Sequence, residues 1–203
     1  MAGTTTFLPF IPEHSDDATA IFEHTQVLSP SFPKRSLHIK LFTEVKNAAV
    51  LYDYLFNNSA HNSSLKNCIC IFVNPACIVS ILHIVHAMHR ALFNEITHQL
   101  RTKSLQTELL FCLSGSANIS ESLQLFGINK NLTELLLVTL DTTPQQMQQL
   151  EELIKGTAAT LNKLPQYMDV NLIKKHLNCL DDEMALPGGL EGAMLSRIAT
   201  KGL

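Results

Sequence analysis

The chain has 203 residues, of which 46% are hydrophobic and 16% are charged. That composition is too apolar for a disordered chain, and the length suits one domain with a sizeable core. The formal net charge of -3 excludes a generally basic protein that coats nucleic acid, although it leaves room for a small basic surface. The cysteines are odd in number and stand mostly in apolar runs, so we expect reduced thiols in a soluble intracellular protein.

The N-terminal region, residues 1–34, mixes prolines with polar residues, and we predict that it is a mostly extended arm. In residues 35–203, predicted strands alternate with predicted helices and nothing marks an internal boundary. We therefore predict a single α+β domain over 35–203. Its core would be a central mixed sheet of about four to five strands, flanked by helices.

The hydrophobic pattern assigns the elements in chain order. The clearest signal is the start of a long helix, because Asn74 is a good N-cap and Pro75 suits the first helical position. The predicted strands are 35–42, 67–73, 109–113, 135–140 and an edge strand at 157–162. The predicted helices are 43–55, 74–101, 120–126, 144–155, 170–177 and, after a Pro-Gly-Gly hinge, 190–201.

Two groups of residues could bind a metal or carry redox chemistry. His83, His86 and His89 fan over roughly 120° of a helix surface, whereas zinc-binding pairs on helices favour i, i+4 spacing. Cys68 and Cys70 point to one face of a strand, and this C-x-C spacing differs from the C-x-x-C of redox motifs. We interpret the cysteines as core residues, and we predict no metal and no cofactor.

Motifs for nucleophilic catalysis or nucleotide binding are missing from the sequence. It contains no G-x-S-x-G, no Walker A sequence and no kinase signature such as H-R-D or D-F-G. We therefore predict that the protein is not an enzyme and has no catalytic residues.

A polar face of the 74–101 helix is a candidate for nucleic-acid contact. It holds two arginines about three turns apart, and Lys103 follows just beyond it. Arginines on a rigid element suit phosphates and base edges, but any amphipathic helix also needs a polar face. The residues at helical spacing are His83, His86, Arg90, Asn94, Thr97 and Arg101.

The last helix, 190–201, has one apolar side and one side of small residues. Such a helix can dock both on its own domain and on a partner, in the helix-in-groove manner. Simple packing on its own domain explains the pattern equally well. The two sides consist of Leu190, Met194 and Ile198, and of Gly192, Ser196 and Ala199.

Several stretches match the motifs of one known family. The segment 42–48 (FTEVKNA) is similar to a family motif F-x-x-V-K-N-A that follows the first strand, and 101–114 resembles R-T-R/K-x-L-x-x-E followed by L-S. The segment 118–128 continues with N-I-S and F-G-I, and the basic tail 197–203 is also similar. Over about residues 35–203 the chain thus resembles the PRPK-binding (TPRKB-like) small subunits of the KEOPS/EKC complex.

The resemblance implies a non-catalytic subunit that binds the PRPK-type atypical kinase/ATPase directly, through its C-terminal helix. It also implies indirect association with the Kae-type catalytic subunit and the other KEOPS subunits. The family's complex makes threonylcarbamoyl-adenosine in ANN-decoding tRNAs, and its small subunit recruits tRNA by the CCA end. We expect such a protein in the cytoplasm and nucleus, with no membrane partner. The alternative is a purely structural or regulatory adaptor of the kinase without direct RNA contact.

These expectations select two sets of site residues. For tRNA, the family's basic positions combine with the polar helix face, and for the kinase the C-terminal helix supplies the contacts. The predicted tRNA-binding residues are Arg90, Asn94, Arg101 and Lys103. The predicted kinase-binding residues are Leu190, Ala193, Met194, Ser196, Arg197 and Ile198.

Overall fold

The centre of the fold is an antiparallel sheet. The structure is a computed structural model that describes residues 19–24, 35–56, 68–178 and 188–201. The strand order is β1-β2-β4-β3, with β5 also on β2. The α+β class is confirmed, but every pairing between described strands is antiparallel, where we expected a mixed sheet. The strands are β1 (Thr19–His24), β2 (Arg35–Thr43), β3 (Ile69–Val73), β4 (Leu135–Leu140) and β5 (Thr157–Ala159).

Strand β2 organises the sheet because it pairs with three other strands. β4 runs along one edge of β2, from Leu37 opposite Leu140 to Phe42 opposite Leu135. β1 and β5 share the other edge, where β1 pairs with residues 35–40 and β5 pairs with residues 41–43. Part of the predicted N-terminal arm is therefore a strand of the domain's own sheet. The rest of the arm lies outside the described residues.

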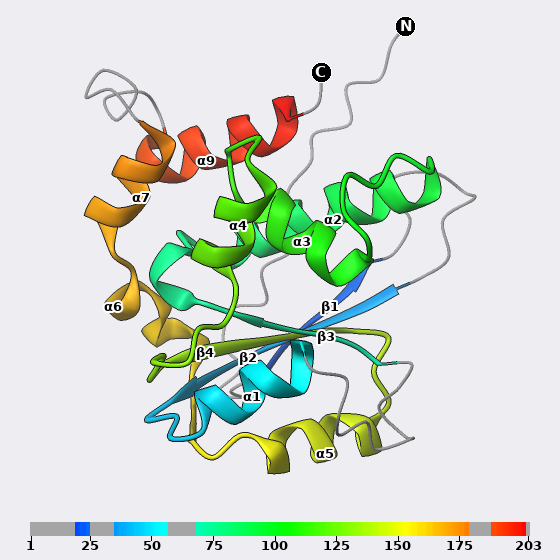
Figure 1. The fold of residues 1–203 in the computed structure, drawn as a ribbon, viewed down its shortest axis with the longest axis vertical. Helices are drawn as coiled ribbons and strands as arrows, with labels where there is room; N and C mark the ends of the chain where they lie inside the picture. The colour runs from blue at the N-terminus through cyan, green and yellow to red at the C-terminus, as the bar shows by residue number, and fades with distance from the viewer. Residues whose placement is uncertain (1–18, 25–34, 57–67, 179–187, 202–203) are drawn as a thin grey trace, which may run out of the picture.

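Helices cover both faces of the sheet and make three layers (Figure 1). α1 (Ala48–Phe56) and α5 (Pro144–Leu153) lie on one face. None of the described helices is long and apolar enough to span a membrane. The other face carries α2 (Ile81–Ile96), α3 (Leu105–Leu113), α4 (Ile119–Phe126), α6 (Leu164–Tyr167), α7 (Val170–Leu177) and α9 (Gly189–Thr200), with the 3-10 turns η1 (Pro75–Cys77) and η2 (Leu161–Lys163).

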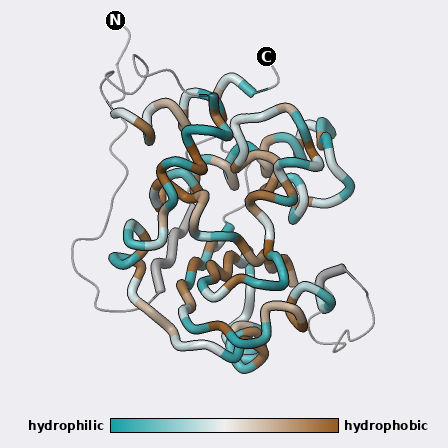
Figure 2. The backbone as a smooth tube through the Cα atoms, turned by 60° about the vertical axis from the view of Figure 1, so that its left-hand side comes forward, coloured by the Kyte–Doolittle hydropathy of each residue, from teal (hydrophilic) through white to brown (hydrophobic). Residues whose placement is uncertain are grey.

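Strand β4 shows how one sheet serves two cores. All six of its residues are buried, and their side chains point alternately to opposite faces. Leu136 and Val138 pack in the core beneath α2 and α3, whereas Leu135 and Leu137 pack in the core beneath α1 and α5. Figure 2 shows the hydrophobic segments gathered in the interior of the molecule.

The strand predicted at 109–113 is wrong, because these residues form the second half of α3. Ser104 and Thr107 make a reciprocal capping box that starts this helix. Residues 108–113 are all buried, since α3 lies against α2, α4 and β3. A helix buried on every side has no polar face, so its apolar run has the same pattern as a buried strand.

The single long helix predicted at 74–101 is also wrong. Asn74 caps only the short turn η1, and the chain is extended again before Ser80, which is the true N-cap of α2. α2 ends at Ile96, and His98 adopts the left-handed conformation with a φ of 57°. Residues 97–103 therefore form a loop rather than two more turns of helix.

The other predicted elements are confirmed, with boundaries that shift by a few residues. The N-cap of α4 is Asn118 instead of Ser120. β5 is shorter than the predicted strand at 157–162, and the turns η2 and α6 that follow it were not predicted.

Candidate functional site

Two basic side chains hold the C-terminal helix α9 on α2 and α3. Arg90 of α2 donates to the backbone carbonyl of Lys201. The amine of Lys201 donates to the carbonyls of Phe111 and Ser114, the latter at 2.6 Å, and lies 3.4 Å from the centroid of the Phe111 ring. Burial lowers the pKa of the Lys201 amine to about 8. These contacts fix the last turn of α9 against the domain.

The polar face predicted to join Arg90, Asn94 and Arg101 does not form. Arg90 is half-buried and bound to Lys201. Asn94 is 8% exposed, and its amide donates to Glu108 at 2.8 Å inside the molecule. Arg101 lies beyond the end of α2, so it does not share a helix with the other two. Of the predicted tRNA-binding residues, Arg101 and Lys103 are exposed.

Glu108 fixes the loop that carries these two cations. Its carboxylate has no exposed surface, and Oε2 accepts the backbone N–H groups of Arg101 and Thr102 at 3.0 and 2.9 Å. The Thr102 hydroxyl donates to the same oxygen at 2.8 Å, and Asn94 donates to Oε1. A buried carboxylate with four donors is fully satisfied. Sequence reasoning did not assign Glu108 a role, although a charged residue inside an apolar run is a signal for such a centre.

The three histidines of α2 have different surroundings. His83 is fully buried, with Nε2 donating to the Leu113 carbonyl at 2.8 Å and Nδ1 accepting from the Val79 N–H at 3.4 Å. Burial lowers the pKa of His83 to about 4, so the ring is neutral. His86 is exposed and His89 is half-buried, so the polar face predicted for this helix does not include His83. In the part of the chain that the structure describes, no three His, Cys, Asp or Glu side chains lie close enough to share a metal ion.

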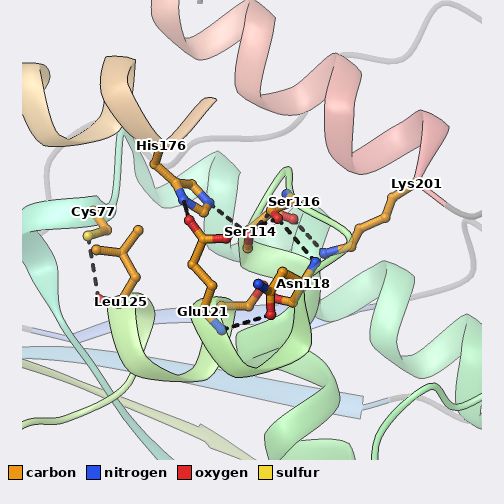
Figure 3. Close-up of polar contacts among 9 residues, drawn as sticks. Cys77, Ser114, Ser116, Asn118, Glu121, Leu125, His176 and Lys201 are labelled. Atoms are coloured by element: carbon orange, nitrogen blue, oxygen red, sulfur yellow. Dashed lines mark hydrogen bonds and ion pairs between the residues drawn. The ribbon is translucent and has the colours of Figure 1, made fainter. Parts of the chain in front are cut away.

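Polar side chains from α4, α7 and the turn after α3 form a hydrogen-bonded chain (Figure 3). Ser114 Oγ lies 2.8 Å from His176 Nε2, and His176 Nδ1 lies 3.2 Å from Glu121 Oε1. The backbone N–H of Ser116 donates to Ser114 Oγ at 3.0 Å. The ring of His176 also meets Phe126 edge-on. Sequence reasoning missed this cluster, because its members come from three separate elements and no local motif marks them.

The order serine, histidine, carboxylate is that of a hydrolase triad, but the geometry does not support hydrolysis. Ser114 has no exposed surface, so its hydroxyl cannot reach a substrate. Its oxygen already contacts His176 and the Ser116 N–H. We interpret this series of hydrogen bonds as a structural link between the turn after α3 and the helices α4 and α7.

Gly115, the next residue in that turn, allows α7 and α9 to approach it closely. A Cβ atom at this position would lie 2.8 Å from Leu177 Cδ2 and 3.1 Å from Arg197 Cδ. Both distances are shorter than ordinary van der Waals contact. The turn after α3 is therefore one place where both α7 and α9 pack closely against the domain.

α9 buries one side and exposes the other. Met194 and Ile198 are 0% and 2% exposed and belong to the main core, so these predicted kinase anchors are not available on the surface. Packing on its own domain, one of the two alternatives for this helix, accounts for both. The outward side is polar and small. Ser196, Ala199 and Thr200 are exposed, and Leu190, Ala193 and Arg197 are half-buried.

Comparison with known proteins identifies relatives along most of the chain. Residues 42–202 match the family described as kinase binding protein CGI-121. EKC/KEOPS complex subunit CGI121 of Yarrowia lipolytica is 27% identical over 175 residues, which is 82% of this chain and 97% of the relative. EKC/KEOPS complex subunit cgi121 of Schizosaccharomyces pombe is 24% identical over 87% of this chain and 99% of the relative. EKC/KEOPS complex subunit TPRKB of Danio rerio is 27% identical over 79% of this chain and 88% of the relative.

The family match begins at the end of β2 and includes α9. It therefore covers the loop 97–103 with Arg101 and Lys103, the turn after α3 and the outward side of α9. The resemblance inferred from the sequence motifs is thereby confirmed. This chain belongs to the CGI-121 family of kinase-binding proteins.

Proposed function

We propose that this chain is a non-catalytic subunit of a KEOPS/EKC complex, which binds the PRPK-type kinase and recruits tRNA for threonylcarbamoyl-adenosine modification. The observation that carries the proposal is the family match over residues 42–202, supported by relatives named as EKC/KEOPS subunits. The burial of Ser114 supports a non-catalytic role, because the serine of the triad-like chain has no path to a substrate.

We assign the kinase contact to the outward side of α9. Small side chains at Ser196, Ala199 and Thr200 leave room for a partner to approach the helix closely. The inward side is fixed by Met194 and Ile198, so a partner would meet a surface that needs little ordering on binding. The Kae-type catalytic subunit and the other subunits would then be reached through the kinase.

We assign the tRNA contact to the loop 97–103 and the last turn of α2. Arg101 and Lys103 are exposed cations, and Phe93 and Ile96 are 39% and 46% exposed. Cations suit phosphates, while an exposed ring offers a stacking surface for an unpaired base, as at a CCA end. Two phosphate contacts predict a shallow salt dependence, with a slope of about -1.4 for log affinity against log salt concentration.

The test uses the chain purified together with its kinase and mixed with tRNA in a gel-shift assay, with and without the CCA end. Binding should weaken when the CCA end is removed or when Arg101→Glu and Lys103→Glu are combined, while the kinase stays bound. Lys155→Glu with Lys163→Glu is the matched control, because both lysines are exposed and the charge change is the same. Unchanged tRNA binding after both the CCA deletion and the Arg101/Lys103 substitution would contradict the assignment.

A kinase adaptor without RNA contact is the second candidate. It is favoured by the net charge of -3 and by the internal hydrogen bonds of Arg90 and Asn94, which leave two of the four predicted RNA contacts exposed. In that case the kinase would co-purify and no tRNA shift would appear. For either function we place the chain in the cytoplasm and nucleus, which fractionation with an antibody against the chain would test.

A further inference from the structure

The loop 97–103 is held through its backbone and not through its cationic side chains. Glu108 Oε2 accepts the consecutive N–H groups of Arg101 and Thr102, and it also accepts the Thr102 hydroxyl. The Thr102 side chain is therefore turned inward, while Arg101 and Lys103 on either side of it are exposed. Among the described residues, neither of these two cations forms an ion pair with a carboxylate. The buried carboxylate thus fixes the loop and leaves both positive charges available to a ligand.

Thr102 connects this loop to the helix that follows it. Its hydroxyl donates to Glu108 Oε2 at 2.8 Å and lies 3.0 Å from the hydroxyl of Thr107, which belongs to the capping box of α3. The other end of the loop is bound to α2, because the Gln99 N–H donates to the Asn94 carbonyl at 2.7 Å. The conformation of the loop is therefore defined at both ends before any ligand binds.

A loop that is already fixed binds a flexible ligand at a lower entropic cost. Association is opposed by the conformational entropy that loops and side chains lose when they become ordered. An unpaired RNA end is itself flexible, so a flexible protein loop would add its own loss of entropy to that of the RNA. Burial of a carboxylate disfavours folding unless its hydrogen bonds are complete. Here those bonds fix the backbone of a surface loop that carries two cations.

We propose that Thr102 and Glu108 are positioning residues for RNA binding, which hold the loop so that Arg101 and Lys103 meet the phosphates of a single-stranded RNA end together. The proposal rests on the tRNA contact assigned to this loop under the proposed function. It extends that assignment, because it gives a role in RNA affinity to two residues that act only through the cations beside them.

The test is a double-mutant cycle on tRNA affinity, measured by gel shift with the chain purified together with its kinase. Thr102→Val removes the hydroxyl at nearly constant shape, and Glu108→Gln keeps the size of the side chain but replaces one of its two acceptor oxygens. Each change is made in the wild-type chain and in an Arg101→Gln/Lys103→Gln chain. Glutamines remove the two charges without reversing them, so that residual tRNA binding stays measurable.

Two control variants separate the loss of this hydroxyl from the loss of any hydroxyl. Thr102→Ser keeps the donor to Glu108. Thr160→Val is the matched control, because Thr160 is also half-buried and its side chain makes no capping hydrogen bond to η2. A melting curve for each chain shows that it is folded at the temperature of the binding assay.

We expect Thr102→Val and Glu108→Gln each to weaken tRNA binding about ten-fold in the wild-type chain, and by less than about two-fold in the Arg101→Gln/Lys103→Gln chain. The effect should be lost in the second chain because the cations to be positioned are no longer there. Thr102→Ser and Thr160→Val should bind tRNA as the wild type does.

The proposal is overturned if folded Thr102→Val or Glu108→Gln binds tRNA with wild-type affinity. It is also overturned if the loss is equal in the two chains, since a general structural effect would not depend on the cations. In both cases weaker binding by the Arg101→Gln/Lys103→Gln chain would still support the proposed tRNA contact. A wild-type chain that gives no tRNA shift would contradict the tRNA contact and the positioning role together.

Discussion

Lowering the pH from 7.5 to 4.5 should weaken the fold of the wild-type chain more than that of a His83→Gln variant. The ring of His83 has no exposed surface, and burial holds its pKa at about 4, against 6.5 in an unfolded chain. Between these two values the unfolded chain binds a proton that the folded chain does not. The contribution of His83 to the free energy of unfolding is therefore fully present above pH 6.5 and is lost as the pH falls towards 4.

The size of the effect follows from the two pKa values. A displacement of the His83 pKa from 6.5 to about 4 corresponds to about 3 kcal/mol in full, and most of this is lost by pH 4.5. Glutamine stays neutral over this range, and its amide can donate to the Leu113 carbonyl in place of Nε2. At pH 7.5 the variant should be less stable than the wild type by about 1 kcal/mol, because the glutamine side chain does not fill the site of the imidazole ring fully.

Urea unfolding of both chains at pH 7.5 and 4.5 measures this difference. The other titrating groups are common to both chains, so the change in the difference reports His83 alone. His86→Gln, on the exposed side of the same helix, is the control and should lose as much stability as the wild type on acidification. If wild type and His83→Gln lose equal free energy, the ring is not buried and neutral as described.

Three further predictions concern the interior. Gly115→Ala should lower the free energy of unfolding by about 1–2 kcal/mol, measured in urea, because its Cβ would press on Leu177 and Arg197; an unchanged stability would mean that α7 and α9 do not meet there. Glu108→Ala should lower the free energy of unfolding by about 3 kcal/mol and speed hydrogen exchange at the Arg101 amide, because several donors lose their acceptor. Slow exchange at Arg101 in the variant would contradict the role of Glu108 in fixing the loop. Chelator should leave the melting temperature unchanged, and a stoichiometric zinc whose removal lowers it would refute the prediction of no structural metal.

Most of the fold could be predicted from the sequence, because most strands and helices have a clear hydrophobic periodicity and most helices begin at a capping residue. β4 and α7 agree with their predicted bounds. The failures have a common cause in burial. α3 is enclosed on all sides, so its sequence carries no amphipathic signal, and the break between η1 and α2 falls in a run of apolar residues that continues the helical pattern.

The site could be predicted less well, because surface and interior positions on α2 and α9 alternate with no sharp difference in residue type. Asn94 and His83 are polar yet buried, each satisfied by a partner from another element. Met194 and Ile198 could have faced a partner, but the domain itself covers them. The motif resemblance identified the family correctly, while the exposure of individual residues required tertiary structure.

The most direct test of the proposed function is the affinity of the kinase for a Ser196→Arg variant. Ser196 is exposed on the outward side of α9, so a bulky charge there should block a partner without disturbing the core that Met194 and Ile198 form. Val50→Arg is the matched control, because Val50 is 58% exposed on α1, on the opposite face of the sheet.

Calorimetric titration with the kinase, with a melting curve for each chain, provides the measurement. We predict that Ser196→Arg weakens kinase binding at least about a hundred-fold, a loss of about 3 kcal/mol typical of a central interface position. Its melting temperature should remain that of the wild type, and Val50→Arg should bind normally. Wild-type kinase affinity in a folded Ser196→Arg chain would contradict the assignment of α9 as the kinase-binding surface.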